Sequence, residues 1–284
     1  LFGLWHHLPP ETICINPPSR AVEADRKPYQ IRVAREVGFA IPPTLFSNDP
    51  AKIRGSIRKW GGRAIYKPLG SRKNFWWDSQ AQRLVTLFTT AIDESSLPDD
   101  RTLTLTPGIY QPLLPKAFDL RVTVFGHTVF GTKILSQEQE RSQIDWRNGQ
   151  RTLHYESFEA GTKISQLCIS MLCKLGLLMG CFDFVVTPDG DVVFLEVNEG
   201  GQFLWLESAS GAPILDAFSD FLIQPRADFR WQPPPAPLRI QQVQVLAAER
   251  MAEAAETHVD PESFYLDAAE PAVEVKPDGQ KNSS

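Results

Sequence analysis

Residues 181–198, CFDFVVTPDGDVVFLEVN, constrain the fold of this chain more than any other stretch. Two runs rich in valine and phenylalanine flank TPDG, in which proline and glycine stand where a type I turn favours them. Strand-forming runs joined by so short a turn predict an antiparallel hairpin. Residues 119–135, DLRVTVFGHTVFGTKIL, predict a second hairpin around FGHT.

Helical patterns alternate with these hairpins. Apolar spacing predicts a helix from residue 20 to Gly38, and further helices over 49–62, 164–178 and 212–224. Residues 63–70 favour a strand, and residues 101–113 favour a strand pair. Hairpins with helices packed on them indicate an α+β fold with largely antiparallel sheets. No GxGxxG follows a first strand, and GSRKNF (70–75) lacks the P-loop spacing, so both nucleotide-binding folds are excluded.

The composition is typical of a globular enzyme. The 284 residues are 42% hydrophobic, and their net charge of −5 argues against nucleic acid as a partner. No apolar run approaches the length of a membrane span. The four cysteines, Cys14, Cys168, Cys173 and Cys181, show no CxxC or Cys/His metal spacing. We therefore expect reduced thiols and a cytoplasmic protein.

The second strand of the 181–198 hairpin carries polar residues inside an apolar run, FLEVN. Side chains alternate along a strand, so Glu196 and Asn198 share one face. Folding back through TPDG places Asp183 opposite Glu196, within about one residue of register. Two carboxylates so close in an apolar setting need a cation, and oxygen ligands suit Mg²⁺. The alternative is that both carboxylates are solvated on an exposed strand face.

Three basic residues are candidates for contacts with an anionic ligand. Lys67 ends the predicted strand AIYK before a glycine-bearing turn, where a lysine can reach phosphate oxygens or simply be solvated. Arg121 lies within the strand DLRVTV and needs an anionic partner where it faces the interior. Arg147, in DWRNG, either binds a phosphate or extends its charged end into solvent.

With these motifs in this order, the chain resembles an ATP-grasp ligase from about residue 16 to residue 224. It is most similar to the peptide maturases of microviridin type, the graspetide synthetases, and among them to the actinobacterial branch. The likeness is carried by YKPLG, YQPLLPKAFDLRVTVFG, DWR, GCFDFVVTPDGDVVFLEVN and GQFLWLE. This resemblance implies two α+β subdomains that clasp ATP between their sheets.

The resemblance also implies a domain organisation. We expect residues 1–20 to be the remnant of a preceding N-terminal domain and residues 21–224 to form the ATP-grasp domain. Its small nucleotide lid would span about 44–113, and its larger metal-binding part about 114–224. Within 225–284, composition predicts a proline-rich linker, a helix over 238–257 and a disordered polar tail.

Site roles follow from the same resemblance. The implied catalytic positions, at the γ-phosphate or the acyl intermediate, are Arg121, Arg147 and Asn148. The implied nucleotide contacts are Lys27, Lys67, Gln111, Pro112, Leu113 and Asp119. The implied magnesium ligands are Asp183, Glu196 and Asn198. The cofactors would be ATP and Mg²⁺, as one or two ions for which Mn²⁺ can substitute.

The implied reaction is an ADP-forming ligation. Asp or Glu side chains of a ribosomal precursor peptide would be activated as acyl phosphates. A Ser or Thr hydroxyl, or a Lys amine, of the same peptide would then attack the acyl carbon. The product is a macrocycle closed by ω-ester or ω-amide bonds. We expect the precursor peptide as partner, a homodimer as one option, and neither nucleic acid nor a membrane.

Two other functions remain open. One is a glutamate-adding or glutathione-synthetase-like ligase, and the other is a nucleotide-binding regulatory module without turnover. The regulatory alternative rests on Glu199. In the enzymes that the chain resembles, the turn after the metal-binding Asn usually begins with proline, whereas here the sequence is NEGG. Release of ADP separates the ligases from the module. Extension of a protein tail by free glutamate identifies the glutamate-adding ligase.

Overall fold

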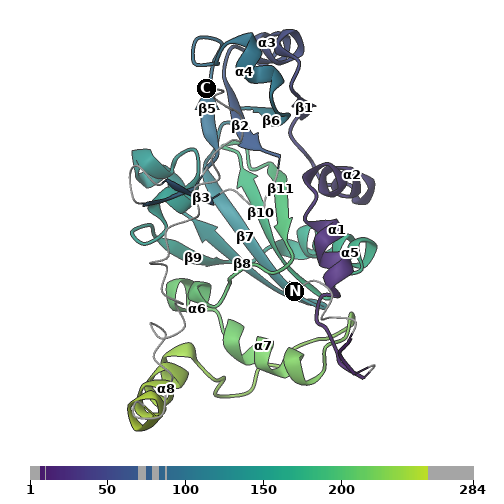
Figure 1. The fold of residues 1–284 in the computed structure, drawn as a ribbon. Helices are drawn as coiled ribbons and strands as arrows, with labels where there is room; N and C mark the ends of the chain where they lie inside the picture. Colours follow the sequence, from purple (N-terminus) through teal and green to yellow (C-terminus); the bar gives the residue numbers. More distant parts are fainter. Residues whose placement is uncertain (1–6, 10, 70–74, 79–82, 87, 255–284) are drawn as a thin grey trace, which may run out of the picture. The chain divides into compact units, whose positions relative to one another are not determined.

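A computed structural model describes residues 7–9, 11–69, 75–78, 83–86 and 88–254 (Figure 1). The chain divides into one compact unit that ends at Ile240 and a second that starts at Gln241. In its described part the second unit contains helix α8 (Ile240–Ala254), where the sequence predicts a helix. The predicted disordered tail lies outside the described residues. None of the helices in the described ranges is long and apolar enough to cross a membrane.

The larger sheet of the first unit is built from the two predicted hairpins and one added strand. Its strand order is β11-β10-β7-β8-β9, and each neighbouring pair is antiparallel. The strands are β7 (Phe118–Phe125), β8 (Thr128–Ile134), β9 (Tyr155–Phe158), β10 (Met179–Val186) and β11 (Val192–Asn198). Both hairpin predictions are therefore confirmed, as is the α+β fold class.

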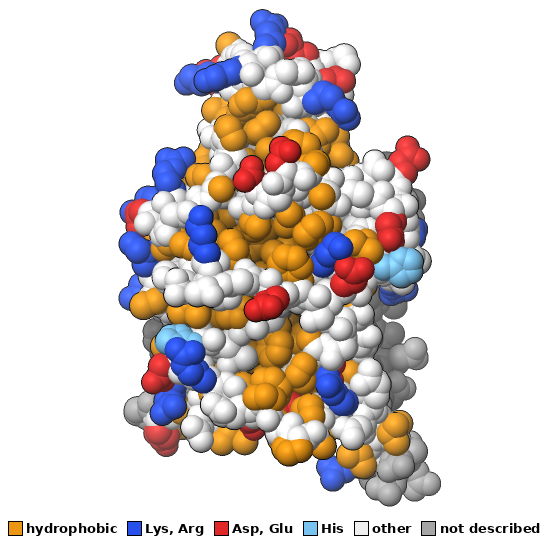
Figure 2. Space-filling view, turned by 180° about the vertical axis from the view of Figure 1, so that it is seen from behind, with side chains coloured by type: hydrophobic (Ala, Val, Ile, Leu, Met, Phe, Trp, Pro, Cys, Tyr) orange, Lys and Arg blue, Asp and Glu red, His pale blue; other side chains and the backbone are white. Residues whose placement is uncertain are grey.

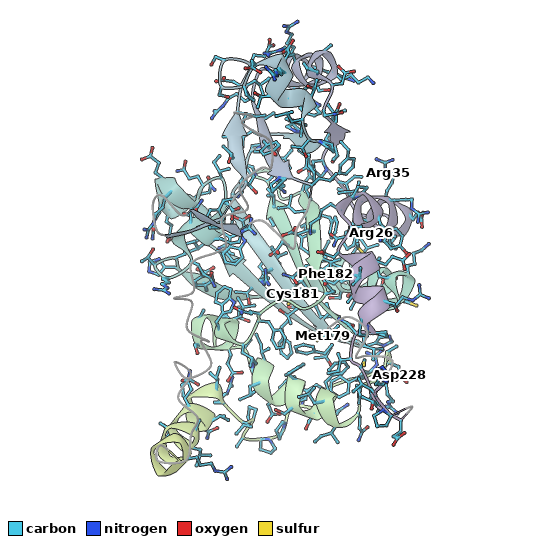
Figure 3. All side chains as sticks on the ribbon, viewed as in Figure 1. Arg26, Arg35, Met179, Cys181, Phe182 and Asp228 are labelled. Carbon is cyan, nitrogen blue, oxygen red and sulfur yellow. The ribbon has the colours of Figure 1, made fainter. Side chains whose placement is uncertain are left out.

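One face of this sheet carries the main hydrophobic core. Phe182 and Phe184 of β10 point into it together with Leu120 and Val122 of β7, as the alternation of side chains requires. Figure 3 shows Cys181 and Phe182 as successive residues of β10. Three helices cover this face (Figure 1): α1 (Pro18–Ala24), α2 (Lys27–Val37) and α5 (Gly161–Leu175).

The opposite face is apolar at one end and charged further along. At the apolar end, Met179 and Cys181 pack with Phe203 and with two further helices. These helices are α6 (Trp205–Ser210) and α7 (Ile214–Ile223). Asp183 of β10 and Arg121 of β7 are directly paired residues on the same face, beyond this apolar cluster. The change from apolar to charged side chains marks where a polar ligand can approach the sheet.

The proline-rich stretch after residue 225 lies against the apolar end of the sheet. Phe229 is buried, and its carbonyl accepts a hydrogen bond from the N–H of His127 in the β7–β8 turn at 2.8 Å. Farther along, the carboxylate of Glu207 accepts a hydrogen bond from the N–H of Ile240 at 2.7 Å. These contacts hold the proline-rich stretch against the β7–β8 turn and α6. The domain boundary near residue 225 stays a prediction.

A smaller antiparallel sheet has the strand order β1-β6-β2-β5. Its strands are β1 (Leu45–Ser47), β2 (Ala64–Pro68), β5 (Thr90–Ile92) and β6 (Gly108–Pro112). Helices α3 (Pro50–Lys59) and α4 (Asp100–Thr104) pack on it through Ile53, Ile57 and Leu103. A separate hairpin pairs β3 (Phe75–Asp78) with β4 (Arg83–Thr86).

Two predictions of secondary structure are wrong in part. The helix predicted from residue 20 to Gly38 is broken between α1 and α2, because Pro28 stands in the first turn of α2. Proline begins a helix readily but cannot continue one. The strand pair predicted over 101–113 begins as α4, since the Asp99 side chain accepts a hydrogen bond from the Thr102 N–H at 2.7 Å.

Figure 2 shows the face opposite to that of Figure 1, with hydrophobic side chains gathered along its middle. Basic and acidic side chains are interspersed around them. Over the described residues of this face, the mixture of signs leaves no continuous basic surface.

The free thiols provide a test of the fold. Cys168 and Cys181 are buried, Cys173 is exposed and Cys14 is intermediate. Burial raises the pKa of the Cys168 and Cys181 thiols and so lowers their reactive thiolate fraction at any given pH. At mildly alkaline pH we expect a thiol reagent to modify Cys173 first, and Cys168 and Cys181 only after unfolding in urea. Peptide mapping by mass spectrometry checks this, and early modification of Cys168 would contradict the packing of α5.

Candidate active site

Two adjoining cavities, each of about 290 Å³, are lined by residues of both sheets. The first extends from β6 along β7 and β10, and the second extends towards α2. They share seven lining residues: Lys67, Thr89, Gln111, Arg147, Leu195, Glu196 and Asn198. A divided cleft of this kind, with convergent polar groups, suits a ligand that has several different parts.

A β-bulge shapes the wall of the cleft that β11 provides. Asp183 pairs with Glu196, as predicted, but the next pair is Phe184 with Phe194, so Leu195 is an extra residue on β11. Leu195 and Glu196 therefore both line the cavities, whereas Phe194 is fully buried in the core. Without the bulge, strict alternation would put Phe194 and Glu196 on the same face.

Each carboxylate of the opposed pair is held by a cation. The Nη1 of Arg121 donates to both carboxylate oxygens of Asp183 at 2.9 Å. Lys27 Nζ lies 2.7 Å from Glu196 Oε2. The prediction that an inward-facing Arg121 needs an anionic partner is confirmed. Protein cations thus neutralise both carboxylates of the pair.

The two carboxylates differ in their electrostatic environment. Attraction to Lys27, reinforced by Lys67, holds the pKa of Glu196 well below its usual range, although burial opposes this. Burial raises the pKa of Asp183, and the neighbouring Glu196 acts in the same direction while Arg121 opposes both. Burial also lowers the pKa of Lys67. Glu196 is therefore the more firmly ionised member of the pair.

Asp145 orients Arg147 at the mouth of the first cavity. Its carboxylate accepts hydrogen bonds from Arg147 Nε at 2.8 Å and from the Arg147 backbone N–H at 3.1 Å. It also accepts a hydrogen bond from the Thr89 N–H at 3.1 Å, just before β5. Burial, the largest influence, works against ionisation, but the Arg147 guanidinium and these hydrogen bonds keep the pKa of Asp145 below its usual value. The carboxylate thereby links Arg147 to the smaller sheet.

Three 3₁₀ helices lie between β8 and β9: η2 (Ser136–Glu138), η3 (Glu140–Ser142) and η4 (Trp146–Gly149). Asp145 is the residue directly before η4. Trp146 and Trp205 lie with their ring centroids 5.7 Å apart. Tyr155 meets Trp205 edge to face at 5.2 Å, and the Arg121 guanidinium lies 5.7 Å from the Trp146 ring. Trp146 and Trp205 both line the first cavity, so this aromatic group forms one of its walls.

The strand end Gln111–Leu113 forms the opposite wall of the first cavity. The Oε1 of Gln111 is buried without a hydrogen-bond partner among the described residues, while its Nε2 donates to Thr44 at 2.9 Å. Pro112 has no N–H to offer a ligand, whereas Leu113 has one, which donates at 3.4 Å to the Arg63 carbonyl. Asp119 lies nearby and forms an ion pair with Lys116 at 3.0 Å.

The structure brings together all the predicted site residues except one. Asn148 is exposed and lines neither cavity, and its backbone N–H donates to the Asp145 carbonyl at 3.1 Å. The residue-by-residue roles stay predictions. Sequence reasoning did not single out Asp145, Lys116 or Trp146. An Asp two residues before Arg147 was a usable signal for Asp145, because that spacing suits a local carboxylate–arginine pair.

The donor set fits a hard divalent cation. Within the described ranges, no three His, Cys, Asp or Glu side chains are grouped as metal ligands. The predicted set has two carboxylates and one amide, all oxygen donors, which is typical of Mg²⁺ that shares its shell with phosphates and water. Gly201 keeps space open beside Asn198 and Arg121. A Cβ on this residue would lie 3.0 Å from the Asn198 side chain and 3.1 Å from the Arg121 side chain.

Comparison with protein-family models gives no match, and comparison with curated proteins gives none either. Solved structures do match. A RiPP-associated ATP-grasp ligase from Chryseobacterium gregarium, in complex with ADP and a leader and core peptide, is 26% identical with a TM-score of 0.72. The alignment covers 81% of this chain and 69% of that one.

Two macrocyclases from Microcystis aeruginosa MRC are also similar. MdnC, bound with the precursor peptide MdnA, is 27% identical with a TM-score of 0.63, over 74% of this chain and 63% of MdnC. MdnB is 29% identical with a TM-score of 0.62, over 78% of this chain and 66% of MdnB. The chain thus spans about two thirds of the length of the proteins it matches.

Two antiparallel sheets that line one charged cleft, and these structural matches, define the class: the chain has the ATP-grasp fold. Within that fold it is similar to the ATP-grasp ligases of ribosomal peptide modification, as its motifs predict. The likeness to an actinobacterial branch stays a prediction.

The Arg121–Asp183 pair gives a test of how the cleft is held. Their side chains are 7% and 13% exposed, so Arg121→Leu leaves a buried carboxylate without its cation. We expect this variant to lose about 3–5 kcal/mol of unfolding free energy, as breaking a buried pair does. Arg121→Leu combined with Asp183→Leu should lose less than the sum of the single changes. Urea unfolding measures all four proteins, and additive losses would contradict a coupled buried pair.

Proposed function

We propose that this chain is an ADP-forming ATP-grasp ligase that crosslinks a ribosomally made precursor peptide. It activates Asp or Glu side chains of the peptide and closes ω-ester or ω-amide macrocycles. One observation carries the proposal: Asp183 and Glu196 stand opposite each other in a cleft that is also lined by basic residues, four of which come from α2, β2, β7 and η4. These residues are Lys27, Lys67, Arg121 and Arg147.

The nucleotide is assigned to the cavity walls by their chemistry. The apolar strand end Gln111–Leu113, with its unpartnered Gln111 oxygen, suits the base, and Asp119 lies on the same side for the ribose. Lys67 borders both cavities and offers a positive charge to phosphate oxygens. Asp183, Glu196 and Asn198 would hold Mg²⁺. When bound, the ion supplies charge neutralisation for the phosphates.

The proposed reaction has two steps. A carboxylate oxygen of the peptide attacks the γ-phosphorus, the bond to the bridging oxygen breaks, and ADP leaves. A hydroxyl or amine of the same peptide then attacks the acyl carbon, phosphate leaves, and the nucleophile loses its proton. Arg121 and Arg147, aimed at the cleft by Trp146 and Asp145, stabilise the negative charge that develops on phosphoryl and acyl oxygens.

The peptide would enter beside the aromatic wall. Trp205 lines the first cavity, with its ring tilted against Trp146 and edge to face with Tyr155. Aromatic side chains that are held in place offer contact area at little entropic cost. A homodimer and a cytoplasmic location remain predictions.

Glu196→Gln and Asp183→Asn test the assignment. Each replaces a charged oxygen ligand with a neutral amide of the same shape. We expect each variant to fold and to lose at least about 100-fold in peptide-dependent ADP release, since metal ligation and phosphate alignment fail together. Coupled-enzyme detection of ADP measures this. Asp189→Asn, in the exposed turn of the same hairpin, is the matched control and should keep wild-type rates.

Wild-type turnover in either ligand variant would overturn the metal assignment. Tight ATP binding without any ADP release, in the wild type with peptide and Mg²⁺, would favour a regulatory module. ADP release with free glutamate and growth of a protein tail would favour a glutamate-adding ligase.

A further inference from the structure

β11 is an edge strand, and it carries two of the three proposed metal ligands. The five-stranded sheet ends with β11, which pairs with β10 on one side and, on the other, forms a single parallel bridge between Val193 and Ala40. The outward backbone groups of an edge strand need partners other than a strand. Before the bulge, the Phe194 N–H donates to the Ala40 carbonyl at 2.9 Å. After the bulge, the outward backbone N–H and C=O of Val197 are hydrogen-bonded by a side chain.

That side chain is Gln30 of α2, which is 1% exposed. Its Oε1 accepts a hydrogen bond from the Val197 N–H at 3.1 Å, and its Nε2 donates to the Val197 carbonyl at 2.8 Å. The second hydrogen on Nε2 is used at 2.6 Å by the Ala24 carbonyl. The backbone N–H and C=O of Val197 fix which way the amide faces. Gln30 therefore takes the place of a neighbouring strand at one residue.

Val197 is the residue between Glu196 and Asn198. The face of α2 that carries Gln30 also carries Lys27, three residues earlier, and Lys27 pairs with Glu196 at 2.7 Å. Helix α2 thus holds the backbone of one residue and the side chain of the one before it. Arg35 of α2 and Arg26, which directly precedes the helix, are exposed; both are labelled in Figure 3.

A second amide continues this support past the end of the strand. Asn16 Nδ2 donates to the Glu199 carbonyl at 2.5 Å and to the Met179 carbonyl at 3.0 Å. Its Oδ1 accepts from the Leu178 N–H at 2.9 Å. The NEGG turn that begins at Asn198 is therefore tied to the start of β10 by a side chain.

We propose that Gln30 is a positioning residue, which sets the directions of Glu196 and Asn198 by holding Val197. The inference rests on the proposed function, because it takes these two side chains as metal ligands. A buried amide costs desolvation that a leucine of similar size would not. What the amide adds is a fixed backbone just past the bulge, where the strand is otherwise held by β10 alone. Partners that orient ligands in this way typically affect metal affinity.

Gln30→Leu tests the proposal, since it keeps the side-chain volume and removes the three hydrogen bonds. Two readouts are made without turnover: Mn²⁺ binding by electron paramagnetic resonance in the presence of ADP, and hydrogen exchange at the Val197 amide. We expect Mn²⁺ to bind roughly 10–100-fold more weakly and Val197 to exchange at least about 10-fold faster. A third readout, the Mg²⁺ concentration for half-maximal ADP release, should rise by the same factor as Mn²⁺ binding weakens.

Val33→Ala is the matched control. Val33 lies on α2, is 2% exposed and packs in the core, and its apolar side chain makes no hydrogen bond to β11. It should lower the thermal midpoint while leaving Mn²⁺ binding and Val197 exchange unchanged. If Gln30→Leu does not fold, Gln30→Met is used, which keeps an unbranched neutral side chain and also removes the three hydrogen bonds. It should weaken Mn²⁺ binding in the same direction.

The outcomes separate the two claims. The positioning role is overturned if a folded Gln30 variant binds Mn²⁺ with wild-type affinity. It is also overturned if Val33→Ala changes Mn²⁺ affinity and Val197 exchange as much as Gln30→Leu does. Absence of Mn²⁺ and nucleotide binding in the wild type contradicts the proposed function. In that case exchange at Val197 still decides whether Gln30 fixes the strand.

Discussion

The architecture of the cleft depends on keeping two carboxylates opposite each other on neighbouring strands. Like charges in directly opposed positions destabilise a sheet pair, so Asp183 and Glu196 require cations from outside their hairpin. Arg121 comes from the next strand, β7, and Lys27 comes from α2. The fold therefore has to bring a hairpin, a third strand and a helix of the N-terminal segment to one point. The strand order and the packing of α2 on the sheet do this.

The same arrangement explains why the cleft is so heavily charged and yet nearly neutral. Most cations in it face an internal carboxylate: Lys27 with Glu196, Lys116 with Asp119, Arg121 with Asp183 and Arg147 with Asp145. In the proposed function, Asp183 and Glu196 would hold a divalent ion, which would supply charge neutralisation for the phosphates. Because each of the two carboxylates lies beside a protein cation, none of these charges is buried alone.

The sequence predicted the parts of the fold that depend on local pattern. Alternating apolar residues and short turns predicted both hairpins and, to within about one residue, the position of Asp183 opposite Glu196. The bulge at Leu195 could not be predicted, because one extra residue in an apolar run changes neither composition nor turn spacing. α4 was missed because RTLTLT alternates like a strand, and the capping by Asp99 prevailed over that pattern.

The sequence also did not predict the long-range polar contacts that support the site. Gln30 looks like a surface residue of an amphipathic helix, and only the packing of α2 on β11 shows that it is buried against Val197. Asn16 is likewise a polar residue before prolines, yet it bonds residues more than 160 positions away. Such pairs leave no periodic trace in a single sequence. The candidate site could therefore be listed from motifs, but the residues that hold it in place could not.

The most direct test of the account is a paired measurement on the wild-type protein with Mg²⁺, ATP and a short candidate precursor peptide rich in Thr, Asp and Glu. ADP release and the intact mass of the peptide are followed in the same reaction. The account predicts that the peptide loses the mass of one water for each crosslink, with one ADP formed for each water lost. A peptide of unchanged mass, in a reaction where ATP is bound or hydrolysed, would contradict it.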